Sequence, residues 1–533
     1  MYTPMLSSRL RRARSLALLA PMLLVTACND LSVDPFSEIP ADQFFQNEEE
    51  VLAALAPVYA NLRNVLSNAD YHGVTQVSSD ETIVPTRGTD WGDQGVWLQL
   101  HFQDWGASHP YLNGVWNTAS TGIARSNGIL SSLQTAEIPN KEATVAEVRA
   151  LRAFYYYILL DMFGRAPLVG DEEGEFLPDP NDPPPAAERA EIFDFVESEL
   201  LAVEDALPNQ IPGRFGGDVV RALLANLYLN AEVFTGTVSA SGLTRGAPRW
   251  QEAFDYADEL IDSGRYQLAD DYLAMFGPGN AGNPEFIFAI EHLAEAGLGA
   301  NFPNRSLHYN STNVGGWNGF STLADTYTSF EDGDVRQEMF LIGPQVNLIT
   351  GEPVNDRQGD RLDFTLTFDK RTNTGVEDVT DAIDYAGVRP NKFFPDPNEI
   401  NGNHGNDYPF FRLGEMYLIR AEAAFELGQS GTALSDLNAL RDRAGAEALS
   451  SVDRETILLE RLYELFYEAR RRQDLIRANE SISATDESTP AGSGNLFTRA
   501  WGFKDAADPY RVVYPIPQPQ LNANPNLTQN AGY

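Results

Sequence analysis

The sequence predicts a mostly α-helical protein with one large loop-rich lobe that contains a few short strands. Along much of the 533-residue chain, apolar residues recur every three or four positions, which is the spacing of one helix face. Between residues 268 and 408 this periodicity stops, and Gly, Pro, Asn and Asp become frequent. Aromatic residues make up 11% of the chain, a share that disordered chains do not reach, so most of it should fold.

The first 28 residues have the pattern of an export signal rather than of a folded element. Four arginines precede an apolar run over residues 15–25, which is too short to span a bilayer. Small residues then precede Cys28, the only cysteine, as in a bacterial lipobox. We therefore expect a signal peptide over residues 1–27, lipidation of Cys28 and a solvated tether over residues 28–40. The alternative is an ordinary secretory signal that contains a stray thiol.

Helices are expected throughout residues 41–267, the first folded region. Asn47 and Glu50 have the spacing of an N-cap and its capping-box partner, and so do Thr144 and Glu147. Each pair stands before a stripe of apolar residues at helical spacing. Three further helices are predicted by periodicity, over residues 187–206, 219–228 and 249–263.

The C-terminal region, residues 409–533, contains the clearest helix pair. Residues 411–427 and 431–444 carry small alanines on facing sides, and Gly428 separates them. This arrangement resembles a tetratricopeptide unit, although its period is not repeated regularly. A third helix is expected from Asp453. In the loop-rich lobe, residues 286–290 and 364–368 have the composition of short strands.

Several arginines and one glutamate on the predicted helices are expected to form structural ion pairs. These residues are Arg149, Arg152, Arg420 and Glu422. The run Arg470–Arg472 should lie near a helix C-terminus, where the dipole favours cations, and at least one of the three should also pair with a carboxylate.

Charge and motifs exclude several classes of function. The net charge of −38 opposes binding to nucleic acid or to an anionic membrane. The sequence has no nucleophile elbow, zinc-protease, phosphate-loop or dinucleotide motif, so we expect no enzyme, no cofactor and no metal. Two alternatives stay open. A secreted glycoside hydrolase needs only two suitably spaced carboxylates, and a helical-repeat scaffold could instead recruit protein partners.

Tryptophans indicate where a ligand could bind. Four of the seven fall within a Trp-rich loop over residues 80–116, and glycines there disfavour a regular helix around Trp91 and Trp97. A second stretch, residues 308–318, combines aromatic rings, amides and glycines. A sugar needs a flat ring face and planar polar partners. The predicted ligand-binding residues are Trp91, Trp97 and Trp317 for stacking, with Asp80, Arg87 and Asn313 for polar contacts.

Core packing is the competing interpretation for each tryptophan, because Trp is usually largely buried. We expect it to hold for Trp105 and Trp116.

Seven stretches, taken in order, resemble the SusD/RagB family of nutrient-uptake lipoproteins. The segment Glu464–Arg477 and the ending Gln529-Asn530 with Gly532-Tyr533 are the most specific of them. One departure is Gln473, where the family often has an aromatic residue nearby. The stretches are the lipobox with residues 40–50, then 79–81, 147–164, 331–336, 407–423, 464–477, and 514–517 with 524–533.

The resemblance implies a SusD-like fold, with tetratricopeptide-type helix pairs that form a superhelical scaffold packed against an irregular lobe. It also implies a binding protein rather than an enzyme, lipid-anchored in the cell outer membrane and facing the exterior. Such a protein captures glycan or peptide oligomers and delivers them to a SusC-like TonB-dependent barrel. In the family, ligand contacts commonly come from the early loop and the mid-chain insertion.

Overall fold

A computed structural model describes residues 47–170, 175–179, 181–313, 315–478 and 495–533. Residues Phe45–Tyr533 form one compact unit. The predicted signal peptide, Cys28 and the tether lie outside the described residues. None of the described helices combines the length and the apolar character that crossing a bilayer requires.

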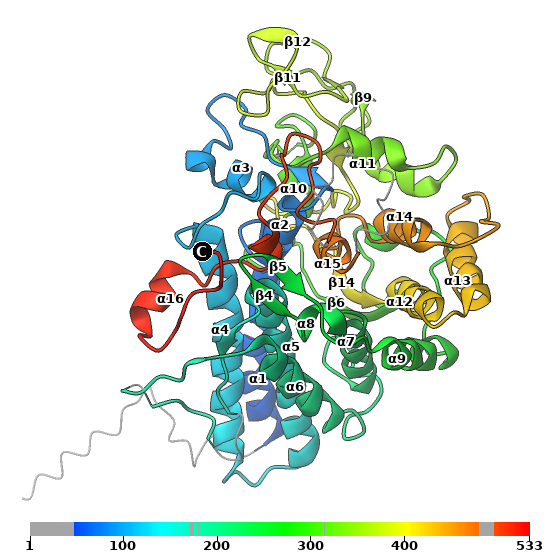
Figure 1. Ribbon diagram of the computed structural model, residues 1–533. Coiled ribbons are helices and arrows are strands. Elements are labelled where there is room, and N and C mark those ends of the chain that lie inside the picture. The colour runs from blue at the N-terminus through cyan, green and yellow to red at the C-terminus, as the bar shows by residue number, and fades with distance from the viewer. Residues whose placement is uncertain (1–46, 171–174, 180, 314, 479–494) are drawn as a thin grey trace, which may run out of the picture. The chain divides into compact units, whose positions relative to one another are not determined.

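Of the N-terminal helices, α1, α4, α5 and α6 lie side by side, whereas α2 and α3 lie outside this group (Figure 1). α1 begins as predicted, because the side chain of Asn47 accepts a hydrogen bond from the Glu50 N–H at 3.0 Å. Along this part of the chain α4 contacts both α1 and α5, α6 packs on α5, and α7 packs on α9. These elements are α1 (Glu48–Val65), α2 (Tyr71–Val77), α3 (Val96–His101), α4 (Pro110–Leu133), α5 (Lys141–Phe163), α6 (Arg189–Leu201), α7 (Gly217–Leu229), α8 (Ala231–Phe234) and α9 (Trp250–Asp262).

The capping box predicted at Thr144 and Glu147 is wrong. α5 begins three residues earlier, at Lys141, after Asn140 in a left-handed conformation with φ of 55°. Glu147 is buried and accepts a hydrogen bond from Arg214 Nε at 2.8 Å, so it serves a tertiary contact rather than a helix end.

The predicted C-terminal helix pair is confirmed as α12 (Leu413–Glu426) and α13 (Ser430–Arg443). Gly428 separates them with φ of 77°, a conformation that glycine adopts without steric cost. Ala421 and Ala424 lie in one buried cluster with Ala433 and Leu437, and such small side chains allow the helices to approach closely. α14 (Arg454–Leu465) follows, capped by Asp453 as predicted, and α15 (Arg471–Arg477) and α16 (Gln518–Ala523) complete the described helices.

The loop-rich lobe contains short strands and two short helices, α10 (Phe302–Ser306) and α11 (Ala324–Ser329). The predicted strand over residues 286–290 is confirmed as β6 (Phe286–Ile290), which pairs with β14 (Tyr408–Arg412). The strand predicted over residues 364–368 is wrong beyond Phe364, because Phe368 packs into a buried cluster with Ile83 and Leu323 instead.

Every sheet in the described residues is an antiparallel pair of strands, so no layer of sheet covers the helices. The pairs besides β6 with β14 are β1 (Thr82–Ile83) with β7 (Ser321–Thr322), β2 (Ala166–Pro167) with β3 (Ala186–Ala187), β4 (Thr237–Ser239) with β5 (Gly242–Thr244), β8 (Phe340–Leu341) with β13 (Arg389–Pro390), β9 (Gly343–Pro344) with β10 (Asp363–Phe364), and β11 (Asp369–Lys370) with β12 (Asn373–Glu377).

The predicted structural ion pairs are present. Arg149 and Arg152 both contact Glu199, Arg420 contacts Asp436, and Glu422 contacts Arg477. The placement of Arg470–Arg472 near a helix C-terminus is wrong, because these residues begin α15. All three side chains are buried there, and each pairs with a carboxylate: Glu415, Asp80 and Asp161 respectively.

A group of buried charges, here called the central ion-pair cluster, joins the lobe to the C-terminal helices. Arg412, at the end of β14, donates to Glu285 at 2.8 Å, to Glu464 at 2.6 Å and to Glu468 at 2.7 Å. Glu464 also pairs with Arg336 at 3.2 Å and with Arg443. The whole cluster consists of Arg336, Lys392, Arg412, Arg441 and Arg443 with Glu285, Asp334, Glu460, Glu464 and Glu468.

Replacing Glu464 with Gln should lower the free energy of unfolding by about 3–5 kcal/mol, because it leaves buried guanidinium groups without their counter-charge. Glu252→Gln is a suitable control, since the pair of Glu252 with Arg249 is about one-third exposed and should contribute less than about 1 kcal/mol. Denaturant unfolding of the full-length protein measures both values. Equal losses in the two variants would contradict the structural role of the cluster.

Glu81 should make stability depend on pH. Burial raises the pKa of this carboxyl from 4.5 to about 8, so between those values the folded protein holds a proton that the unfolded chain has released. Stability therefore falls as pH rises through this window, by up to about 1.4 kcal/mol per pH unit.

The variant Glu81→Gln should reduce this slope while unfolding remains cooperative; Asp70 and Asp407, whose pKa values burial raises to about 7 and about 6, supply the remainder. Denaturant melts at several pH values between 5 and 8 measure the effect. An unchanged slope in the variant would show that another group carries the dependence.

Candidate functional site

A strained turn positions Trp91. Arg87 and Asp90 exchange backbone hydrogen bonds of 2.9 and 3.2 Å, which closes the turn. Trp91, Asp93 and Gln94 then have positive φ angles of 59°, 35° and 58°. Such conformations cost roughly 1 kcal/mol or more per non-glycine residue, so other contacts must hold them. The Trp97 indole N–H supplies one, donating to Asp93 at 2.9 Å.

A second loop, from the lobe, meets this turn. The Trp91 indole N–H donates to the backbone carbonyl of Trp317 at 2.6 Å. A Cβ on Gly319 would lie 2.5 Å from the Trp91 ring, so only glycine allows the indole to lie this close to the backbone. These contacts hold together two segments that lie more than 200 residues apart in sequence. Beside them, Trp317 remains 38% exposed.

Polar groups border the two indoles. The Tyr309 hydroxyl donates to Asp90, and the Arg357 guanidinium carbon lies 4.0 Å from the centre of the Tyr309 ring. Arg357 also pairs with Asp384 at 2.9 Å and with Asp90 at 3.4 Å. Burial, reinforced by the bond to Asp90, raises the pKa of Tyr309 to about 12, so its hydroxyl stays protonated at neutral pH. We call Asp90, Trp91, Tyr309, Trp317 and Arg357 the aromatic platform.

The structure brings together only some of the predicted ligand residues. Trp91 and Trp317 lie in the platform, and Asn313 is exposed in the same loop as Trp317, where it accepts a hydrogen bond from Asn347 at 3.3 Å. Trp105 and Trp116 are buried, as expected for core residues. Asp80 is elsewhere, engaged with Arg471 at 2.7 and 2.8 Å.

Trp97 and Arg87 do not face solvent. Trp97 was expected on a loop, but Gly95, with φ of 83°, ends the turn and starts α3 there. Trp97 is 1% exposed. The centre of its ring lies 4.7 Å from that of Tyr111 and 5.5 Å from that of Trp91. Arg87 is equally buried and donates to the carbonyls of Ile383 at 2.6 Å and Ala386 at 2.9 Å, and burial lowers its pKa to about 10. Trp97 packs against Trp91 of the platform, and Arg87 holds the loops around it through these carbonyl contacts.

Three platform residues were missing from the predicted set. Asp90 and Tyr309 lie inside the two stretches that the sequence indicates as ligand-binding. Their closeness in sequence to Trp91 and Trp317 could have identified them. Arg357 lies 40 positions beyond Trp317, in a region without periodicity, and no sequence pattern indicates its contact with Tyr309.

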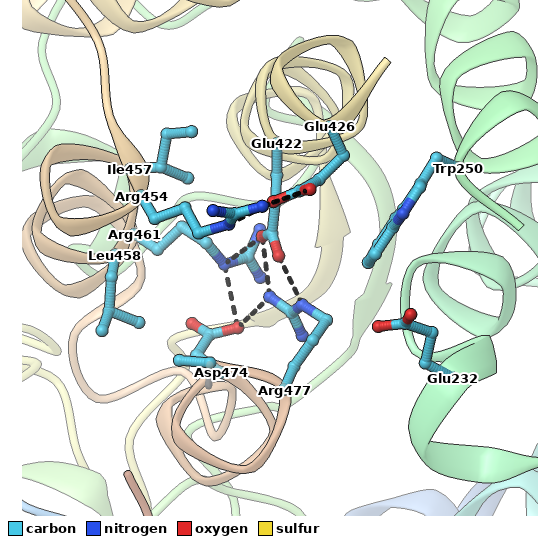
Figure 2. A pocket seen from close by; sticks show the side chains of 11 residues that line it. Glu232, Trp250, Glu422, Glu426, Arg454, Ile457, Leu458, Arg461, Asp474 and Arg477 are labelled. Carbon is cyan, nitrogen blue, oxygen red and sulfur yellow. Dashed lines mark hydrogen bonds and ion pairs between the residues drawn. The ribbon is translucent and has the colours of Figure 1, made fainter. Parts of the chain in front are cut away.

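Cavities elsewhere in the described residues offer other candidate sites. One of about 170 Å³ lies beside α9, α12, α14 and α15, with Trp250 opposite a set of charged side chains (Figure 2). Arg477 contacts both Glu422 and Asp474, Arg461 contacts Asp474, and Arg454 contacts Glu426. These charges neutralise one another inside the protein, as in a structural ion-pair set.

The described residues contain no group of three His, Cys, Asp or Glu side chains that could hold a metal ion.

Comparisons with known proteins found a family model for the C-terminal part of the chain and relatives that align over most of it. A model of the SusD family matches residues 284–533. The starch-binding protein SusD of Bacteroides thetaiotaomicron is 26% identical, over 96% of this chain and 96% of that protein.

Solved structures share the fold. Surface glycan-binding protein A from Bacteroides uniformis aligns with a TM-score of 0.70 and 22% identity, over 91% of this chain and 100% of that chain. The protein of the same designation from Bacteroides thetaiotaomicron, in complex with laminarihexaose, aligns with a TM-score of 0.67 and 21% identity, over 91% and 100%. Residues 284–533 thus match the SusD family model, and the chain shares the fold of these SusD-like structures, with its helix pairs and irregular lobe.

Proposed function

We propose that this chain is a cell-surface protein that captures glycan oligomers on the aromatic platform. The observation that carries the proposal is the hydrogen bond from the Trp91 indole to the Trp317 carbonyl, which joins an early loop to the lobe beside a partly exposed ring. The relative named for starch binding and the fold neighbour bound to laminarihexaose support a glycan as the ligand class.

The chemistry of the platform suits a sugar. The apolar face of a pyranose packs on an indole, and its hydroxyls need planar donors and acceptors nearby. Trp317 supplies the ring, Arg357 supplies donors, and Asp90 supplies acceptors. Asn313, exposed in the Trp317 loop, adds an amide at the edge. An open surface of this kind corresponds to micromolar or weaker binding, roughly −8 kcal/mol or less in magnitude.

Binding without turnover is the expected activity, because SusD-family glycan-binding proteins are non-catalytic. This disfavours the glycoside hydrolase alternative. The second alternative, a helical scaffold that recruits protein partners, does not explain why strained backbone supports tryptophan side chains at an open surface.

Anchoring and delivery complete the proposal. Acylation at Cys28 would tether the body to the outer membrane, and a SusC-like TonB-dependent barrel would receive the captured oligomer. Both steps rest on the lipobox pattern and on the family resemblance. Peptide oligomers are the second ligand class that the resemblance allows.

The double variant Trp91→Ala/Trp317→Ala should lose binding to a glycan that an array identifies, while its helical circular dichroism stays unchanged. Trp250→Ala is the matched control, because Trp250 is a half-buried tryptophan on a different face of the fold. Isothermal titration of the three full-length proteins measures the difference. Undiminished affinity in the double variant would place the glycan elsewhere.

Replacing Cys28 with Ser should abolish acylation and release the protein from membranes, since this thiol is the group that would carry the lipid. Fractionation of producing cells and mass spectrometry of the N-terminal peptide measure these effects. A variant that stays with the membrane fraction would contradict anchoring at Cys28.

A further inference from the structure

Among the described residues, Arg189 is a buried arginine that lacks both an ion pair and the backbone-carbonyl partners that Arg87 and Arg389 have. It is the first residue of α6 and is 6% exposed, yet it forms no ion pair with any described carboxylate. Its Nε and Nη1 atoms are buried without a hydrogen-bond partner. The guanidinium carbon lies 5.6 Å from the centre of the Phe234 ring, a contact that does not satisfy N–H donors.

Electrostatics around Arg189 favour an additional anion. Burial, opposed by Asp161 and reinforced by the neighbouring Arg472, lowers the pKa of Arg189 to about 9. Asp161, however, is engaged with Arg472 at 2.9 Å. Arg189 also occupies the N-terminal end of a 13-residue helix, where the dipole is positive and a cation is unfavourable. Glu188 and Glu191 already place carboxylates at this helix end, but neither forms an ion pair with Arg189.

The Arg189 side chain lines a cavity of about 380 Å³. This volume lies at the lower end of the roughly 300–1,000 Å³ typical of small-molecule sites. Arg165 also lines it and contributes a second guanidinium, whose Nε is likewise buried without a partner. Glu188, which pairs with Arg165 at 3.0 Å, also lines the cavity, and its side chain is 66% exposed. Two guanidiniums and one carboxylate therefore line the cavity, which is positive in a protein of net charge −38.

The C-terminal motif that distinguishes the sequence forms another wall of the same cavity. Asn530 donates to the carbonyls of Phe163 and Tyr514, both at 2.8 Å. The Gln529 amide bonds to both the N–H and the carbonyl of Ile516, each at 2.8 Å. These bonds hold the wall in place without using Arg189.

We propose that this cavity binds the carboxylate group of a small acidic ligand, such as a uronic acid unit, with Arg189 as the principal contact and Arg165 as the second. A guanidinium offers donors in a planar fork that matches a carboxylate, and such charge-assisted bonds are stronger than neutral ones. The site is separate from the aromatic platform and does not depend on its function.

Titration of the full-length protein with D-glucuronate, N-acetylglycine and D-glucose tests this proposal, by calorimetry and by the shift in melting temperature. We expect glucuronate to bind in the millimolar range and to raise the melting temperature, and the neutral glucose to do neither at this site. A response to both acids indicates recognition of the carboxylate alone. A response to glucuronate only indicates recognition of a uronic acid.

Variants separate binding from structure. Arg189→Met should weaken glucuronate binding by at least about tenfold and melt at or above the wild-type temperature, because it removes an unpaired buried charge. Arg189→Lys should retain weaker binding, and Trp91→Ala/Trp317→Ala should bind glucuronate as the wild type does. Wild-type protein that binds neither acid, or unchanged binding in Arg189→Met, would overturn the proposal. The wild-type titration decides it even if that variant fails to fold.

Discussion

The pairing of buried charges is the constraint on which this fold depends. The central ion-pair cluster places five cations and five carboxylates in the interior, and its members come from the lobe, from β14, from α13 and α14, and from the segment between α14 and α15. A buried ion is tolerated only when its partner is held at the right distance. The cluster therefore gives little net stability over an apolar core, but it strongly disfavours any other docking of lobe against helices.

Buried charges that need partners also fix the loops of the aromatic platform. Arg87 and Arg389 are buried side by side, and their partners are backbone carbonyls and side-chain oxygens rather than carboxylates. Both guanidiniums donate to the hydroxyl of Ser321, and Arg389 also donates to Asn318, the neighbour of Trp317. Because so many carbonyls must converge on two cations, the loops that carry Trp91 and Trp317 have a defined relative position. The binding surface is built on loops, yet its scaffold is preorganised.

The contrast between the two proposed sites follows from their surroundings. The aromatic platform offers an exposed ring and paired polar groups, which suits a neutral oligomer that lies across a surface. The Arg189 cavity offers an unpaired cation, which suits a compact anion. Both lie outside the central ion-pair cluster, where every side chain already has an oppositely charged partner.

Sequence alone determined the helical architecture, since periodicity and caps are local properties. Asn47, Asp453 and Gly428 mark helix ends through contacts within a few residues, and the α12–α13 pair and β6 were predicted for the same reason. The Trp-rich loop and the 308–318 stretch were likewise found by composition. Trp91 and Trp317 remain predicted ligand residues, now on one surface.

Only the tertiary structure decided which of these side chains reach solvent. Trp97 and Arg87 lie in the same loop-like stretch of sequence as Trp91 and Asp90, and no local pattern separates the two pairs. Trp97 is buried on α3, and the backbone carbonyls of residues 383–386 enclose the Arg87 guanidinium. Arg357 meets Tyr309 across 48 residues, and Asp161, which acts electrostatically on Arg189, forms its ion pair with Arg472. Burial and pairing between distant segments depend on how the whole chain packs, and a local pattern carries no information about them.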